Sequence, residues 1–344
     1  MLAGFCLLAG CRSVGPQRVL TDRFNYAEAI SRTWKDEILL NLVKLRYADV
    51  PIFLNVSSVV AQYSLEGQVS ATAQFPDISG RDAVGFGGSG RWADRPTITY
   101  VPLSGQQFTR SLLTPIQPAS IVSLVQGGWS VDTVFRICVR SLNGVRAETR
   151  MRLAAQEEDP RFQPLLDALR RLQARGAIGL RVERHDSGEV SLLTLPPDDD
   201  PATREDRKLV ATALGLEQGA REYSLTFGVN NQSNREIAML TRSMIEIFGD
   251  LAFDVQVPPE HLADGRVGDR VRGSGVSRGA FKITSGRERP ADAFAAVRYA
   301  DYWFWIDNRD FSSKRSLAFL YLLISLAETG TGAVVPGLTV TTGP

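Results

Sequence analysis

The sequence has few of the side chains that carry metal or thiol chemistry. Among its 344 residues are only two histidines, His185 and His261, and three cysteines, Cys6, Cys11 and Cys138. Neither histidine has a second ligand at the spacing of a helical or Cys-x-x-Cys zinc site. We therefore expect no metal and no cofactor, and we place both histidines in exposed loops.

The chain also lacks an excess of charge of either sign. Lysine and arginine together number 39, and aspartate and glutamate number 38, so the formal net charge is +1. This balance gives no indication of nucleic-acid binding. No run of cations marks a polybasic membrane patch. At 44% hydrophobic residues the composition is that of a globular protein, with room for one large domain or two of medium size.

No apolar run approaches the ~20 residues of a membrane-spanning helix. The chain opens instead with a short apolar stretch that ends in Leu8-Ala9-Gly10-Cys11. Its length suits the apolar region of a signal peptide. The four final residues resemble the lipobox of bacterial lipoproteins, and the resemblance covers only about a dozen residues of the chain.

This resemblance implies processing and anchorage but neither fold nor activity. Residues 1–10 would be removed as a signal peptide, and Cys11 would carry the acyl chains, palmitate among them. Residues 11–21 would form a lipidated tether. Arg12 in place of aspartate implies sorting to the outer membrane, where we expect the folded part to face the periplasm. Several acyl chains give stable anchoring.

A processed chain would keep one ordinary thiol. Cleavage before Cys11 leaves Cys138, so no internal disulfide can form even in an oxidising compartment. Cys138 lies within the apolar run 134–139. That setting favours a small buried hydrophobe over a reactive thiol.

Hydrophobic periodicity predicts an α+β fold, with mostly antiparallel sheet and packed amphipathic helices. The charged segment 147–160 divides the chain into expected lobes at 22–147 and 160–344. The expected helices cover 25–48, 106–113, 119–125, 162–175, 203–214, 235–253 and 317–327. The expected strands cover 52–60, 62–75, 96–101, 178–184, 189–195, 223–229, 280–284, 302–306 and 333–341, with a turn at 66–67. The segment 131–139 is buried but of uncertain type.

Two short segments match the sequence patterns of known sites but lack the neighbouring secondary structure that those sites need. Residues 85–90 satisfy G-x-G-x-x-G, but a dinucleotide site needs a helix to follow the glycines. Arg91 to Pro96 contains no helix start, so we interpret 78–94 as a loop. Residues 275–279 satisfy G-x-S-x-G around Ser277. The segment before Ser277 resembles a loop, and both histidines precede it, which argues against a serine hydrolase.

The carboxylates offer weak candidates for chemistry. Asp198, Asp199 and Asp200 could bind Ca²⁺ but lack the EF-hand spacing, so a solvated loop is favoured. Asp307, Asp310 and Glu288 lie near the aromatic segment 302–305. Aromatic residues beside paired carboxylates are typical of glycoside-cleaving sites. The favoured interpretation is that the aromatics pack against the C-terminal helix and that Asp307 and Asp310 finish a turn.

These observations lead to three functional hypotheses. The first is a non-enzymatic interaction or assembly module of the envelope, with an envelope protein as partner and no nucleic acid. The alternative is an enzyme that acts on glycan or peptidoglycan through the carboxylates near 307–310. A third, weaker hypothesis is a ligand-binding module that uses the glycine-rich segments 78–94 and 264–279 as flaps.

Overall fold

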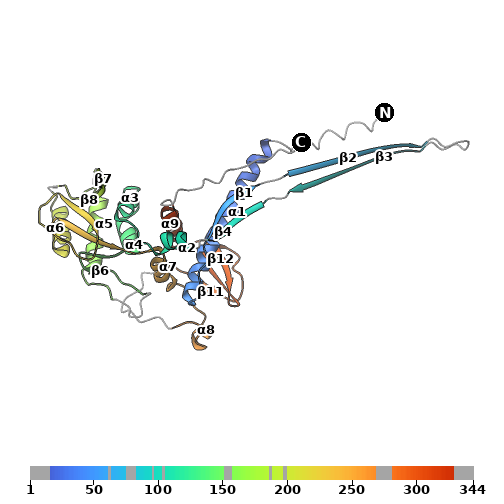
Figure 1. Ribbon diagram of the computed structural model, residues 1–344. Helices are drawn as coiled ribbons and strands as arrows, with labels where there is room; N and C mark the ends of the chain where they lie inside the picture. The colour runs from blue at the N-terminus through green and yellow to red at the C-terminus, as the bar shows by residue number, and fades with distance from the viewer. Residues whose placement is uncertain are drawn as a thin grey trace, which may run out of the picture. The chain divides into compact units, whose positions relative to one another are not determined.

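The chain divides into two compact units (Figure 1). Unit 1 comprises residues 1–51 and 105–331, and unit 2 comprises residues 52–104 and 332–344. This division differs from the lobes expected at 22–147 and 160–344. The computed structural model describes residues 16–60, 63–74, 83–94, 97–102, 105–150, 157–185, 188–196, 200–268 and 281–328.

Unit 1 contains a six-stranded sheet of order β6-β5-β10-β9-β8-β7. Its neighbours pair antiparallel except β9 and β10, which are parallel, so the expected α+β class with mostly antiparallel sheet is confirmed. Strands β5 and β6 precede segment 147–160 and the other strands follow it, so this sheet continues across the expected boundary. The strands are β5 (Val139–Leu142), β6 (Val145–Arg146), β7 (Gly179–His185), β8 (Gly188–Thr194), β9 (Glu222–Phe227) and β10 (Glu236–Thr241).

The prediction of one helix over 235–253 is wrong. Residues 236–241 form β10, and only Met244–Ala252 is helical, as α7. Strand β10 lies between β5 and β9, and most of its residues are buried. A short apolar run buried on both faces has no period that separates strand from helix. The segment left open at 131–139 is helix α4, Val131–Cys138.

Helices α5 (Phe162–Ala174) and α6 (Pro201–Leu214) pack against each other. Their facing surfaces are apolar at helical spacing, as expected for amphipathic helices. Asp200 begins α6 by accepting a hydrogen bond from the Thr203 backbone at 2.9 Å, and Gly215 ends it with a φ of 65°. One buried carboxylate joins the pair: Asp206 accepts bonds from Arg171 at 2.6 Å and from Arg175 at 2.9 Å.

A second part of unit 1 has a three-stranded antiparallel sheet of order β11-β13-β12. Its strands are β11 (Thr284–Gly286), β12 (Ala293–Tyr299) and β13 (Tyr302–Asp307). Helices α1 (Pro16–Arg46), α8 (Pro259–Ala263) and α9 (Phe311–Glu328) complete this part with α7. Short helical segments α2 (Gly105–Phe108), η1 (Thr109–Leu113) and α3 (Pro118–Gln126) follow residues 52–104 of unit 2 in the chain.

Helix α1 is longer than the sequence predicted. It begins at Pro16 instead of near Asn25, so it includes part of the expected tether at 11–21. Proline suits the first helical position because its φ is already helical and its missing N–H has no partner there anyway. Further along, Asp36 accepts a hydrogen bond from the Ala296 backbone at 3.0 Å, which attaches α1 to β12.

The described residues of unit 2 form two antiparallel strand pairs. Strand β1 (Leu54–Val60) pairs with β4 (Thr97–Pro102), and β2 (Tyr63–Gln74) pairs with β3 (Ala83–Asp94). The two pairs keep the same register. Val60 comes three residues before Tyr63, and its partner Thr97 comes three residues after Asp94, the partner of Tyr63. We call β1 to β4 the ribbon.

Two predictions for this region are wrong. Glu66 and Gly67 form no turn, since they lie within β2 and pair with Arg91 and Gly90. The G-x-G-x-x-G residues 85–90 lie in β3 and not in a loop. The predicted strand at 333–341 lies outside the described residues.

The ion pair between α5 and α6 should stabilise the fold in a pH-dependent way. Hydrogen bonds from Arg171 hold the pKa of Asp206 below its usual 3.8, against the opposing effect of burial. Asp206→Asn should therefore lower the free energy of unfolding at pH 7 by about 1–2 kcal/mol. A lowered folded pKa means that this stabilisation is present above pH 3.8 and is lost as pH falls through the folded value.

Denaturant unfolding of both proteins at pH 7 and in acid checks this. The matched control is Asp167→Asn, which removes an exposed ion pair with Arg170 at 3.8 Å and should cost less than about 0.5 kcal/mol. A deficit of Asp206→Asn that stays constant into acid would contradict the assignment.

Candidate functional site

Asp307 and Asp310 lie together in the turn between β13 and α9, where both accept local hydrogen bonds. Asp307 accepts from the Arg309 backbone at 2.8 Å. Asp310 caps α9, accepting from the Ser313 backbone at 3.1 Å and from the Ser313 hydroxyl at 2.6 Å. Glu288 is exposed in the segment after β11. The contacts of both aspartates are therefore those of a turn and a helix cap.

The protonation of Asp310 also differs from that of a catalytic acid. Burial works to raise the pKa of Asp310, but hydrogen bonds from Ser313 and Ser312 hold it below the usual 3.8. A general acid in glycoside cleavage needs the opposite, a pKa raised toward neutrality. Asp310 is therefore kept ionised to stabilise the start of α9.

Other residues named from the sequence have varied outcomes. Cys138 is fully buried, and burial raises the pKa of its thiol far above its usual range, as a structural cysteine requires. Asp200 caps α6. His185 ends β7. The residues Cys11, Asp198, Asp199 and Ser277 lie outside the described residues.

His261 is buried and not exposed as predicted, with 2% of its surface accessible. It lies on α8, where its Nδ1 is 2.7 Å from the hydroxyl of Tyr47 and its Nε2 is 3.3 Å from Nη1 of Arg266. The ring also contacts Tyr302 edge-on, with centroids 5.1 Å apart. Tyr47 precedes His261 by 214 positions, so no local pattern could indicate this burial.

The partners of His261 fix its tautomer. A guanidinium has donors only, so Nε2 must accept from Arg266, and Nδ1 must carry the proton and donate to Tyr47. Both ring nitrogens are then engaged by protein groups. In this arrangement neither nitrogen is open for a metal or for proton transfer to a substrate, and His261 serves to hold α8 against the end of α1.

The same cluster continues to its exposed side through Glu260. Glu260 accepts hydrogen bonds from the Tyr302 hydroxyl and from Arg287, the latter at 2.9 Å. Tyr299 donates to Asp49 at 3.0 Å. We call Tyr47, Glu260, His261, Arg287, Tyr299 and Tyr302 the tyrosine–histidine cluster. It joins α1, α8, β12 and β13 by polar and edge-on aromatic contacts.

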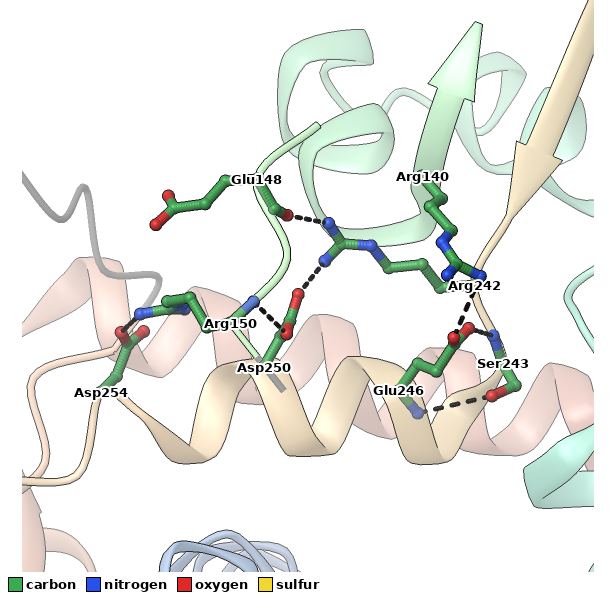
Figure 2. A network of polar contacts seen from close by, with 8 residues as sticks. All are labelled: Arg140, Glu148, Arg150, Arg242, Ser243, Glu246, Asp250 and Asp254. Carbon is green, nitrogen blue, oxygen red and sulfur yellow. Dashed lines mark hydrogen bonds and ion pairs between the residues drawn. The ribbon is translucent and has the colours of Figure 1, made fainter. Parts of the chain in front are cut away.

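A second polar network lies along α7 (Figure 2). Arg242 contacts Asp250 at 2.7 Å, and the two side chains are only 7% and 6% exposed. Arg242 also donates to the backbone carbonyl of Glu148. The second oxygen of Asp250 accepts from the Arg150 backbone at 2.9 Å. Figure 2 shows Arg242 placed between the segment that follows β6 and the helix α7.

Two further ion pairs extend this arginine–carboxylate network. Arg150 contacts Asp254 at 2.7 Å, and Arg140 contacts Glu246 at 3.4 Å. Glu246 also completes a capping box with Ser243 at the start of α7. Burial lowers the pKa of Arg242, and Asp250 opposes that effect. Asp250, Asp254 and Glu246 each have an arginine partner, so the network holds residues 140–150 against residues 242–254.

The sequence contained one signal of this arrangement that the helix prediction missed. Ser243-Met244-Ile245-Glu246 has the spacing of a capping box, which marks a helix start. A prediction based on this capping box would have begun α7 at Met244, where the helix does begin, and would have left Arg242 outside the helix. Its pairing with Glu148 and Asp250 could not follow, because it depends on how the chain segments pack.

Comparisons with protein-family models, curated proteins and solved structures found no match. Within the described ranges, no group of three or more histidine, cysteine, aspartate or glutamate residues is arranged to hold a metal ion. Among those same residues, no helix has the length and hydrophobicity needed to cross a membrane.

Replacement of Arg242 should destabilise the folded protein strongly. Arg242→Met leaves Asp250 buried without its cation and should lower the free energy of unfolding by about 3–5 kcal/mol. The double variant with Asp250→Leu should regain part of this loss. Arg161→Met, at a pair whose arginine is 57% exposed, is the control and should cost under about 1 kcal/mol. Chemical denaturation measures all three, and equal costs for Arg242→Met and the control would contradict this role of the network.

Tyr47 should make the fold sensitive to alkali. Burial, with a contribution from Tyr299, raises the pKa of Tyr47 to about 12 from its usual 10.0. The neutral phenol therefore adds stability that is complete below pH 10 and is lost as pH rises toward 12. In alkaline denaturation, Tyr47→Phe should lose less stability over this range than wild type, although it starts about 0.5–1.5 kcal/mol lower at pH 7. Parallel curves would show that Tyr47 does not control the alkaline transition.

Proposed function

We propose that this protein is a lipid-anchored envelope protein that acts as a non-enzymatic assembly module at the periplasmic face of the outer membrane. The lipobox resemblance at Leu8-Ala9-Gly10-Cys11 supports the anchor. The ribbon of unit 2 supports the assembly role, and the proposal depends on the observation that each ribbon strand has one paired neighbour among the described strands.

The ribbon offers backbone groups to another chain. Each of its strands is hydrogen-bonded to one neighbour among the described strands, its hairpin partner. The outer edge of a strand carries a row of N–H and C=O groups that can pair with a further strand. Proteins commonly cover or interrupt such edges, whereas β2 and β3 each run uninterrupted for 12 residues. Strand addition is an established mode of protein recognition.

No observation favours the enzymatic alternative. Asp307 and Asp310 are engaged in a turn and a helix cap, and the pKa of Asp310 is shifted away from that of a general acid. The flap hypothesis loses part of its basis, since residues 83–94 form a paired strand. The assembly role therefore accounts for the most prominent feature of the fold without requiring a catalytic set.

The anchor and the assembly role can be tested in one experiment. Cells that express tagged protein are labelled with palmitate and then crosslinked. We expect label on wild type and none on Cys11→Ser. A variant in which a short glycine–serine turn replaces 63–94 keeps the Val60–Thr97 pair and should retain the palmitate label but lose the crosslinked complex.

The control is Arg161→Met, a surface change in unit 1, which should retain both label and complex. A complex that persists without 63–94 would show that assembly occurs elsewhere. An unlabelled wild type would contradict the anchor.

A further inference from the structure

The register of β2 and β3 separates apolar from polar residues. In an antiparallel pair, directly opposed residues lie on the same face, and faces alternate along each strand. One face holds six opposed pairs, of which only the terminal pair at the start of β2, Tyr63 with Asp94, contains a charged residue. We call it the apolar face. Its pairs are Tyr63–Asp94, Leu65–Trp92, Gly67–Gly90, Val69–Gly88, Ala71–Phe86 and Ala73–Val84.

The opposite face has a different composition. It holds the only other charged residues of the two strands, Glu66 and Arg91, which oppose each other directly. We call it the polar face. Its pairs are Ser64–Ala93, Glu66–Arg91, Gln68–Ser89, Ser70–Gly87, Thr72–Gly85 and Gln74–Ala83. Such alternation over 12 opposed positions is typical of strands that separate an apolar medium from water.

The length of these strands matches the apolar layer of a bilayer. Each strand has 12 residues, which at about 3.3 Å per residue span about 40 Å. Tilted by about 45°, they would cross about 28 Å, close to the ~30 Å hydrocarbon core. The positions of Tyr63 and Trp92 near one end match the aromatic residues that lie at membrane interfaces.

We propose that β2 and β3 insert into the outer membrane, with the apolar face against lipid acyl chains and the polar face away from them. This inference rests on the proposed function for its location, because the lipid anchor would hold the ribbon at that membrane. Unpaired backbone groups are costly in hydrocarbon. Within the membrane, the outer edges of β2 and β3 would therefore have to pair with further strands.

The positions of the charged residues in β2 and β3 agree with a lipid-facing apolar face. Charges on a lipid-facing strand cost about 2–4 kcal/mol at the bilayer midplane and little near the interface. The one charge on the apolar face, Asp94, belongs to the terminal pair, next to the aromatic end. Glu66 and Arg91 lie deeper in the strands, but they share the polar face and oppose each other.

Fluorescence quenching on the full lipidated chain tests this. Single cysteines are introduced at Val69 and Ala71 on the apolar face, with matched controls at Ser70 and Thr72 on the polar face. They are labelled with an environment-sensitive fluorophore. The lipidated parent chain should take up little fluorophore, since Cys138 is fully buried, Cys6 would be removed with the signal peptide and Cys11 would be acylated. The proteins are reconstituted into phosphatidylethanolamine–phosphatidylglycerol vesicles that contain either an acyl-chain quencher or aqueous iodide.

We expect the acyl-chain quencher to act several-fold more strongly on Val69→Cys and Ala71→Cys than on Ser70→Cys and Thr72→Cys, and iodide to show the reverse order. Iodide quenching at all four positions without acyl-chain quenching would overturn the proposal. Shielding of Val69→Cys from both quenchers would also overturn it, by showing that protein covers the apolar face.

Two controls separate this result from the proposed function. Circular dichroism and thermal unfolding of each cysteine variant should match the parent, which excludes a folding defect. Palmitate labelling of Cys11 reports the anchor independently. A palmitate-labelled chain whose ribbon stays in water would contradict only the membrane insertion. A chain without palmitate whose ribbon enters vesicles would contradict only the lipid anchor.

Discussion

The buried contact between Arg242 and Asp250 is the interaction on which most of unit 1 depends. Arg242 directly follows the central strand β10, and its backbone N–H donates to the carbonyl of Cys138 at 2.8 Å. Its side chain joins Glu148 and Asp250. A charge taken out of water must be paired and hydrogen-bonded, or the fold loses several kcal/mol. The packing of β10, α7 and the segment after β6 therefore has to preserve one geometry.

The second part of unit 1 depends on a smaller contact of the same kind. His261 is held between Tyr47 and Arg266, and Asp36 attaches α1 to β12. Both contacts join the first helix to residues more than 200 positions later. The two ends of the described part of unit 1 are thus joined by part-buried polar bonds, which are directional and specify one arrangement among many apolar packings.

The ribbon of unit 2 follows a different physical rule. Its stability as a hairpin comes from backbone pairing, and a two-stranded ribbon has no core of its own. Alternation of residue type along β2 and β3 gives it two dissimilar faces. We propose that a bilayer of matching thickness covers the apolar face, which would place the ribbon's part in assembly at a membrane.

By itself, the sequence determined the class of fold and many of the elements. Local patterns correctly placed the helices α5 and α6 and the hairpin β7–β8, and they predicted α9 but began it at 317 instead of Phe311. Only the tertiary structure decided the rest. Strand β10 was predicted as helix because burial on both faces removes the alternation of apolar and polar residues that marks a strand. Strand β3 was predicted as a loop because its glycines are typical of loops, and only its pairing with β2 over 12 positions shows that it is a strand. The contacts of His261 with Tyr47 and of Arg242 with Glu148 join residues 214 and 94 positions apart, which no local pattern encodes.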